Sequence, residues 1–234
     1  MFSPDPKPEA RTKKRYKCKY CKEYYMMEKE EYQRNSLTAR SKCCGSIDCL
    51  AQAAGRHIAK SRKEKRVEIG KKKMDLKPRS YWENRLQDKV NQIVKMLDSA
   101  MPCIARPAAG GKMDAGHFHS VGSAKNLRYH FWNIHKQSVH SNQHKSGDTV
   151  AYISGLDIRY GVERREYILE LHRLYPLMKV STYDLRHKHY NKANLIIREL
   201  KSGNMLTRDE CNMILGIHTS EYPADQVAAI QKVY

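Results

Sequence analysis

The chain has 234 residues, with 44 lysines and arginines against 25 aspartates and glutamates, so its formal net charge is 44 − 25 = +19. Such a basic excess argues against an acidic, self-contained metabolic enzyme and indicates a polyanionic partner. The apolar runs, such as Met213-Ile214-Leu215, fall far short of the roughly 18 residues that a membrane span needs. The opening Met-Phe-Ser-Pro-Asp-Pro-Lys-Pro has prolines and an aspartate where a secretory signal carries its apolar stretch, so we expect a cytoplasmic protein.

Positive charge is concentrated in the first third of the chain. Residues 1–79 hold 23 basic and 10 acidic residues (23 − 10 = +13), and residues 80–234 hold 21 and 15 (21 − 15 = +6). The sequence shows no lipidation signal and no basic amphipathic helix with tryptophan or phenylalanine on its other face, so DNA is favoured over a membrane surface. The predicted DNA contacts are Arg11, Lys13, Lys14, Arg15, Arg56, Lys60, Arg62, Lys63, Lys65, Arg66, Lys71, Lys72 and Lys73.

The first 79 residues divide into three segments. Residues 1–15 are rich in proline and then basic, which predicts a disordered arm that settles on phosphates. Residues 16–50 hold five of the seven cysteines and are expected to form a metal-binding module. Residues 51–79 favour helix and are dense in charge, so they form either a basic helical linker on the DNA backbone or a plain solvated helix.

The cysteine spacing predicts one structural zinc site. Cys18 and Cys21 have the two-residue spacing that brings two sulfurs to one tetrahedral ion, and Cys44 with Cys49 supply a second pair. Cys43 competes with Cys44, because adjacent sulfurs rarely fit one tetrahedron. The alternative is a set of reduced cysteines without metal, but so short and charged a segment has little else to fold around.

A helical region with a small β element is expected to follow. Ser80-Tyr-Trp-Glu83 has the pattern of a capping box, and an apolar face follows it, made of Trp82, Leu86, Val90, Ile93, Leu97 and Met101. Prolines and glycines in residues 102–128 indicate turns and short strands. Further helices are expected over 142–155 and 162–175 and after Ser181 and Thr207, and residues 217–234 are expected to form a tail. The predicted fold is mostly α, with C-terminal helices in residues 161–216.

The centre of the chain is rich in histidine. Six of the eleven histidines lie between His117 and His144, beside Asp114, Asn133 and Asn142. A single histidine is usually structural, but this concentration offers what phosphodiester hydrolysis requires: a base that deprotonates water, a cation that neutralises the phosphate, and a group that orients the base.

These residues carry a family resemblance. Asp-Ala-Gly-His-Phe at 114–118, Leu-Arg at 127–128, Asn-Ile-His-Lys-Gln at 133–137 and Asn-Gln-His-Lys-Ser-Gly at 142–147 resemble the NinG (Rap) recombination endonuclease family of lambdoid phages, an HNH-type ββα-metal nuclease group. The likeness covers about residues 16–175. It implies an HNH-like ββα-metal core within residues 80–160, a Mg²⁺ or Mn²⁺ cofactor, and cleavage of branched DNA such as Holliday junctions or D-loops.

The resemblance also implies roles for individual residues. His117 would be the general base and Asn133 would bond backbone across the turn and constrain the loop of the base. Asn142 would be a ligand of the catalytic ion, with His144 or His140 as alternatives. Asp114, His135 and His119 are further candidate ligands or phosphate contacts. Gly116 stands where many HNH enzymes have a carboxylate or histidine.

A second zinc site is expected to be absent. Family members often carry two further cysteine pairs around the central unit, and the corresponding positions here are Cys103 with Arg106 and Ser138 with Ser141. The centre is then expected to be held by packing alone, with a core of Phe118, Phe131, Trp132 and Tyr152.

Two other functions fit parts of the sequence. A non-catalytic DNA-binding accessory protein of recombination would use the cysteine module and the basic helix, and Gly116 favours this alternative. A structural RNA-binding protein fits the charge but leaves the histidines unexplained. Symmetric cleavage of a junction would require two active sites, so a homodimer is a further expectation.

Overall fold

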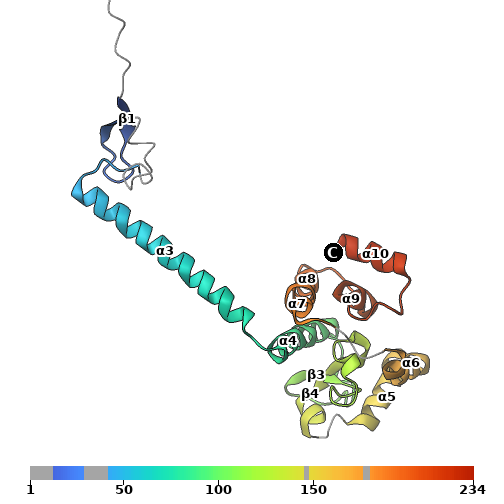
Figure 1. Cartoon of the computed structure of the whole chain (residues 1–234). Helices are drawn as coiled ribbons and strands as arrows, with labels where there is room; N and C mark the ends of the chain where they lie inside the picture. Colours follow the sequence, from blue (N-terminus) through green and yellow to red (C-terminus); the bar gives the residue numbers. More distant parts are fainter. Residues whose placement is uncertain (1–12, 29–41, 145–147, 176–179) are drawn as a thin grey trace, which may run out of the picture. The chain divides into compact units, whose positions relative to one another are not determined.

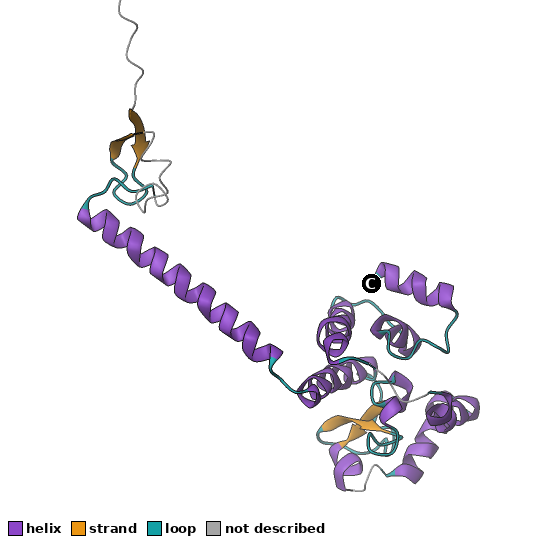
Figure 2. Cartoon of the chain, viewed as in Figure 1, coloured by secondary structure: helices purple, strands orange, loops and turns teal. Residues whose placement is uncertain are grey.

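The computed structural model describes residues 13–28, 42–144, 148–175 and 180–234, and the chain divides into two units, residues 1–76 and 77–234. The described part is mostly helical and contains two small antiparallel sheets (Figures 1 and 2). The sequence predicted the central β element but not the second sheet, which lies in the N-terminal unit. Across the described ranges, no helix combines the length and the apolar character that a membrane span requires.

The described residues of the N-terminal unit form a β-hairpin and one long helix. β1 (Lys13–Lys17) pairs antiparallel with β2 (Tyr24–Glu28), from Lys13↔Glu28 to Lys17↔Tyr24. The expectation of a disordered arm is therefore wrong for residues 13–15, because their backbone forms a sheet ladder, and Arg11 lies outside the described residues. α3 (Ile47–Asp75) starts where the Ser46 side chain accepts a hydrogen bond from the backbone N–H of Cys49.

α3 is a solvated helix over most of its length. Its 29 residues give it a length of about 43 Å. Cys49 and Ala53, both in its first two turns, are its buried residues. The rest carries charged side chains into solvent, so α3 is held by helix propensity and ion pairs between side chains four residues apart, such as Lys72 with Glu68 at 2.8 Å.

The C-terminal unit contains a second hairpin and the remaining helices. In chain order they are α4 (Arg79–Leu97), β3 (Met113–His117), η1 (Lys125–Leu127), η2 (Phe131–Asn133), β4 (Ile134–Ser138), the π-helical turn η3 (His140–His144), α5 (Thr149–Tyr160), α6 (Val162–Leu174), α7 (Thr182–Asp184), the π-helical turn η4 (Leu185–His189), α8 (Tyr190–Lys201), α9 (Arg208–Leu215) and α10 (Ala224–Val233). α10 falls in the segment expected to be a tail, so that expectation is wrong.

α4 is the central helix of this unit. It buries Trp82, Leu86, Val90 and Ile93, as the apolar face predicted, whereas Met101 lies beyond the helix and is exposed. The predicted capping box at Ser80 is wrong. The N-cap is Pro78, whose side chain makes no capping bond, and Arg79 within the first turn pairs with Glu83 at 2.7 Å.

The second hairpin and α5 pack on each other. β3 and β4 pair antiparallel, with Gly116 opposite His135 and His117 opposite Ile134. Tyr152 of α5 is fully buried and donates a hydrogen bond from its hydroxyl to the Gly116 carbonyl at 3.1 Å. Gly155 lets α5 approach closely, because a Cβ at that position would lie 1.7 Å from the Ile104 carbonyl oxygen.

Candidate functional site

The four predicted zinc ligands come together in the N-terminal unit. The sulfurs of Cys18, Cys21, Cys44 and Cys49 lie within 4.8 Å of one another. Cys18 and Cys49 are 3.8 Å apart, and so are Cys21 and Cys44. Two sulfurs of a tetrahedral site with Zn–S bonds of about 2.3 Å are separated by about 3.8 Å, so the cluster has the dimensions of a zinc site.

The structure also separates Cys44 from Cys43. The Cys43 side chain is completely buried and its sulfur accepts the backbone N–H of Gly45 at 3.5 Å, outside the group of four. The pKa of the Cys18 thiol is lowered to about 6, because hydrogen bonds from backbone groups outweigh burial, which raises it. These bonds stabilise a thiolate, the form that binds a metal.

The predicted DNA contacts on α3 fall on different sides of the helix. Successive helical residues turn by about 100°, so Arg62, Arg66 and Lys73 (positions i, i+4 and i+11) share one side. Glu64, Glu68 and Asp75 have the same spacing, shifted by two residues, and therefore lie nearly opposite. α3 thus has a basic side, defined by Arg62, Arg66 and Lys73, and an acid-bearing side.

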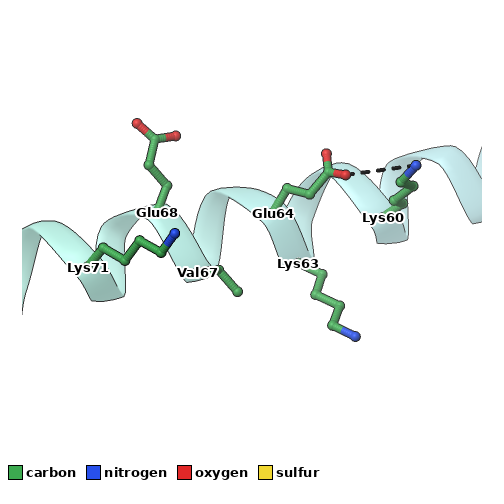
Figure 3. Close-up of a pocket in the computed structure, with 6 residues that line it drawn as sticks. All are labelled: Lys60, Lys63, Glu64, Val67, Glu68 and Lys71. Carbon is green, nitrogen blue, oxygen red and sulfur yellow. Dashed lines mark ion pairs between the residues drawn. The ribbon is translucent and has the colours of Figure 1, made fainter. Parts of the chain in front are cut away.

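The two sides differ in ion pairing. On the acid-bearing side Lys60 pairs with Glu64 at 3.9 Å, and Figure 3 shows both of them with Lys63, Val67, Glu68 and Lys71 around a shallow surface depression. The three cations of the basic side have no ion pair within the described residues, and all are exposed. The depression therefore lies on the mixed-charge side, and unopposed positive charge lies on the basic side.

His117 lies at the end of β3, where the chain leaves the sheet. Its Nε2 is 3.1 Å from the Arg128 carbonyl oxygen. A carbonyl only accepts, so Nε2 carries the proton and Nδ1 keeps a lone pair. Burial lowers the pKa of His117, and the hydrogen bond to Arg128 offsets part of this shift. The net lowering of the pKa favours the neutral form of the ring. A neutral imidazole with a fixed tautomer is suited to accept a proton at Nδ1.

Asn133 closes the loop that follows His117. Its side chain is completely buried, and its Oδ1 accepts the backbone N–H of His119 at 2.8 Å. Its Nδ2 donates to the carbonyls of His119 and Leu127 at 3.0 and 3.3 Å. Asn133 thereby bonds backbone across the turn between the strands and holds the exit of His117 from β3.

The expected ligands of the catalytic ion are not all on the side of His117. Asp114 and His135 belong to the face of the sheet that includes Gly116, and His117 belongs to the other face, because side chains alternate along a strand. His135 is fully buried, with Nδ1 2.9 Å from the Tyr152 hydroxyl, and burial lowers its pKa well below the ordinary value. The expectation that His135 binds the ion is therefore corrected: it is a core residue.

The other expected ligands are dispersed. Asn142 is half-buried in η3, and π-helical turns are frequent at functional sites. His140 in the same turn is exposed, and the side chain of His144 lies outside the described part of the structure. His119 donates from Nε2 to the Ile168 carbonyl at 2.9 Å, which ties the loop to α6. In the described ranges, no set of three histidine, cysteine or acidic ligands forms around His117.

Gly116 has a packing explanation. A Cβ at this position would lie 2.0 Å from Oε1 of Gln137, whose side chain fills the space on that face of the sheet. The carboxylate or histidine that many HNH enzymes place before the base would displace this buried amide.

The four positions that correspond to the second zinc site of family members lie close together. The sulfur of Cys103 accepts the backbone N–H groups of Arg106 and Ser138 at 3.3 and 3.2 Å, and the hydroxyl of Ser138 donates to Ser141 at 3.2 Å. Arg106 directs its guanidinium to Asp148 at 2.6 Å. Hydrogen bonds thus join these positions.

A buried ion pair between Arg208 and Asp98 braces the hairpin. The sequence did not predict this pair. Arg208 of α9 forms hydrogen bonds with both carboxylate oxygens of Asp98 at 2.8 and 2.9 Å, and donates to the carbonyls of Phe131 and Ile134. Asp98 also accepts the backbone N–H of Lys136 in β4 at 2.9 Å. The expectation that packing alone holds the centre is therefore wrong. The predicted core is confirmed for Phe131, Trp132 and Tyr152, which are buried, and Phe118 is partly buried.

Comparison with known proteins identifies the family. A family model described as Bacteriophage Lambda NinG protein matches residues 10–202. Protein ninG of Escherichia phage lambda is 41% identical over 102 residues, which are 43% of this chain and 50% of that protein. Protein ninG of Salmonella phage P22 is 40% identical over 103 residues, 44% of this chain and 51% of that protein. The chain thus spans about half the length of the curated relatives it matches, and no solved structure matches it. Because the family model covers most of the chain, the chain belongs to the NinG family of lambdoid phages.

Proposed function

We propose that this chain is a phage recombination endonuclease that cuts branched DNA, with β3, β4, η3 and α5 as an HNH-like ββα-metal unit. The observation that carries the proposal is His117, a neutral imidazole at the end of β3 whose Nε2–H is held by the Arg128 carbonyl and whose Nδ1 keeps its lone pair. Asn133 fixes the backbone of the loop that follows this position, at His119 and Leu127.

His117 would take a proton from water through Nδ1 as the oxygen attacks the phosphodiester. The Arg128 carbonyl would hold the ring and stabilise the imidazolium that forms, as a hydrogen-bond acceptor does for a charged donor. A divalent ion would neutralise the charge that builds on the phosphate. Mg²⁺ is commonly held by one or two carboxylates together with substrate phosphates, and here we assign it to the amide oxygen of Asn142, which is half-buried in η3. Asp114 lies on the other face of the sheet and is not assigned to it.

DNA binding is assigned to the basic side of α3. Arg62, Arg66 and Lys73 are exposed and unopposed by carboxylates, as backbone contacts to phosphates require. The zinc module would hold the start of α3 through Cys49. Zinc binding would then supply folding free energy to a unit that has few other buried side chains.

The test is cleavage of branched and linear DNA with Mg²⁺ or Mn²⁺ by the full chain. His117→Ala is expected to lower the rate by about 10² to 10⁴ with little change in DNA affinity, since the loss of a general base acts on the transition state. His57→Ala, an exposed histidine of α3, is the matched control and is expected to cleave normally. Asn142→Ala is expected to raise the Mg²⁺ concentration that cleavage requires. Full cleavage by a folded His117→Ala variant would refute the assignment of the base.

A second function is supported by the surroundings of His117. His135 is a core residue and Gln137 fills the space beside Gly116, so the described side chains offer a sparse donor set for an ion. This favours a zinc-containing DNA-binding accessory protein without catalysis. Absence of cleavage by the wild type with every divalent ion, together with tight binding to branched DNA, would select this alternative.

A further inference from the structure

The C-terminal unit contains a cavity of about 400 Å³ beside the loop of His117. Its walls come from the first turns of α4, from the loop between β3 and β4, and from the segment before and within η4. The lining residues are Arg79, Glu83, Val121, Lys125, Arg128, Tyr129, Val180 and Leu185. None of them is among the DNA contacts predicted above, all of which precede residue 77.

The cavity is positively charged. Three cations, Arg79, Lys125 and Arg128, face one carboxylate, Glu83, which gives 3 − 1 = +2. Glu83 pairs with Arg79 at 2.7 Å and with Arg128 at 3.4 Å, and the Asn84 side chain also accepts from Arg128 at 2.8 Å. These bonds hold the guanidinium groups in place before any ligand arrives, so binding costs little side-chain entropy.

Lys125 supplies the mobile charge. It is exposed in η1, and no ion pair joins it to another described residue. Its ammonium is therefore free to contact an anion at the mouth of the cavity, while the two arginines form the wall.

The cavity adjoins the proposed base. The carbonyl of Arg128 holds His117 Nε2 at 3.1 Å, and the side chain of the same residue lines the cavity. The proposed base and the cavity thus share one residue, so a strand held against His117 would pass close to the cavity.

The walls match the chemistry of a sugar–phosphate. Val121, Val180 and Leu185 offer apolar surface for the C–H groups of a deoxyribose, and the cations face an anionic oxygen. We propose that this cavity binds one sugar–phosphate unit of the DNA strand next to the bond that is cut, with Lys125 as its mobile phosphate contact. The proposal rests on the proposed function for the position of the cut, but not for the binding of DNA.

The experiment measures the affinity of the full chain for branched DNA, without divalent ions, and then its cleavage rate. Lys125→Glu is compared with Lys112→Glu, an exposed lysine just before the opposite end of β3 that changes the same charge. One phosphate contact is worth about eightfold in affinity at 0.1 M salt, so Lys125→Glu is expected to weaken binding at least that much, and Lys112→Glu less than twofold.

A neutral methylphosphonate placed at each phosphate near the cut locates the contact. At one position it is expected to weaken binding by the wild type about eightfold and to add little in Lys125→Glu, because both changes remove one interaction. Equal effects of the two lysine variants, or additive losses at every phosphate, would overturn the proposal. If the wild type binds but does not cleave and Lys125→Glu still loses affinity, the cavity stands and the endonuclease proposal fails. If the wild type cleaves and Lys125→Glu binds and cleaves normally, the cavity fails alone.

Discussion

Replacing the basic side of α3 tests the proposed DNA contact directly. In the variant Arg62→Ala, Arg66→Ala, Lys73→Ala, three exposed cations without ion pairs are removed. Alanine has the highest helix propensity, so the helix is expected to persist. We expect weaker binding to DNA and a flatter dependence of affinity on salt, since each phosphate contact releases counterions.

The magnitude follows from the number of contacts. Each neutralised phosphate contributes about 0.9 to the slope of log affinity against log salt, so three contacts lower the slope by about 2.7. The same relation makes the loss of affinity about 500-fold at 0.1 M salt and about 80-fold at 0.2 M. The loss therefore shrinks with salt in a fixed way.

The control variant is Lys60→Ala, Lys63→Ala, Lys72→Ala, which removes an equal number of positive charges from other sides of the helix. Lys60 and Lys72 are paired with Glu64 and Glu68, so we expect this variant to keep the wild-type slope within about one unit. Fluorescence anisotropy of labelled DNA across a salt series measures both slopes, and circular dichroism verifies the helix. Equal slopes for the two variants would refute the assignment of the basic side.

Local patterns in the sequence predicted the features that depend on few residues. The spacing of Cys18, Cys21, Cys44 and Cys49 was sufficient for their cluster, because a tetrahedral ion imposes short spacings on its ligands. The helix start predicted at Thr207 is confirmed, and it is a capping box in which Glu210 bonds back to the N-cap. The helix start is decided within one turn, and the cysteine cluster is decided by two pairs of cysteines that one ion can join.

The first hairpin was not predicted, because its first strand is dense in positive charge. Lys13-Lys14-Arg15-Tyr16-Lys17 contains four cations, which suggested a solvated arm, yet an exposed strand pairs through its backbone whatever its charge. Cation–π contacts also offset the repulsion on this surface, since the Arg15 guanidinium lies 4.0 Å from the centre of the Tyr24 ring.

The candidate site shows a different limit of sequence reasoning. Proximity in sequence suggested His135 as a ligand, but the register pairs His117 with Ile134 and Gly116 with His135, so His135 lies on the opposite face of the sheet from His117. His117 is held by the backbone carbonyl of Arg128, and the sequence of side chains does not indicate such a backbone contact, although Leu-Arg was part of the family pattern. Asp98 and Arg208 are 110 residues apart and belong to no motif, so only the tertiary structure pairs them.

Three further predictions concern stability. Cys49→Ser is expected to lower bound zinc from one ion per chain to below one and to unfold the first hairpin, as metal analysis and hydrogen exchange of residues 13–28 would show. Glu221→Gln is expected to make stability less sensitive to acid. Burial raises the pKa of Glu221, but its hydrogen bond with His130 helps lower the pKa to about 2. The wild type therefore loses stability as pH falls from about 4.5 towards 2. Thermal unfolding of wild type and variant across this range measures the difference in acid sensitivity. Asp98→Asn leaves the buried guanidinium of Arg208 without its counter-charge and is expected to cost about 3–5 kcal/mol in urea unfolding. Arg208 also donates to the carbonyls of Phe131 and Ile134, at the two ends of the segment that contains Asn133. We therefore expect Asp98→Asn to lose cleavage as His117→Ala does. A stable, fully active Asp98→Asn variant would show that the ion pair does not brace the site.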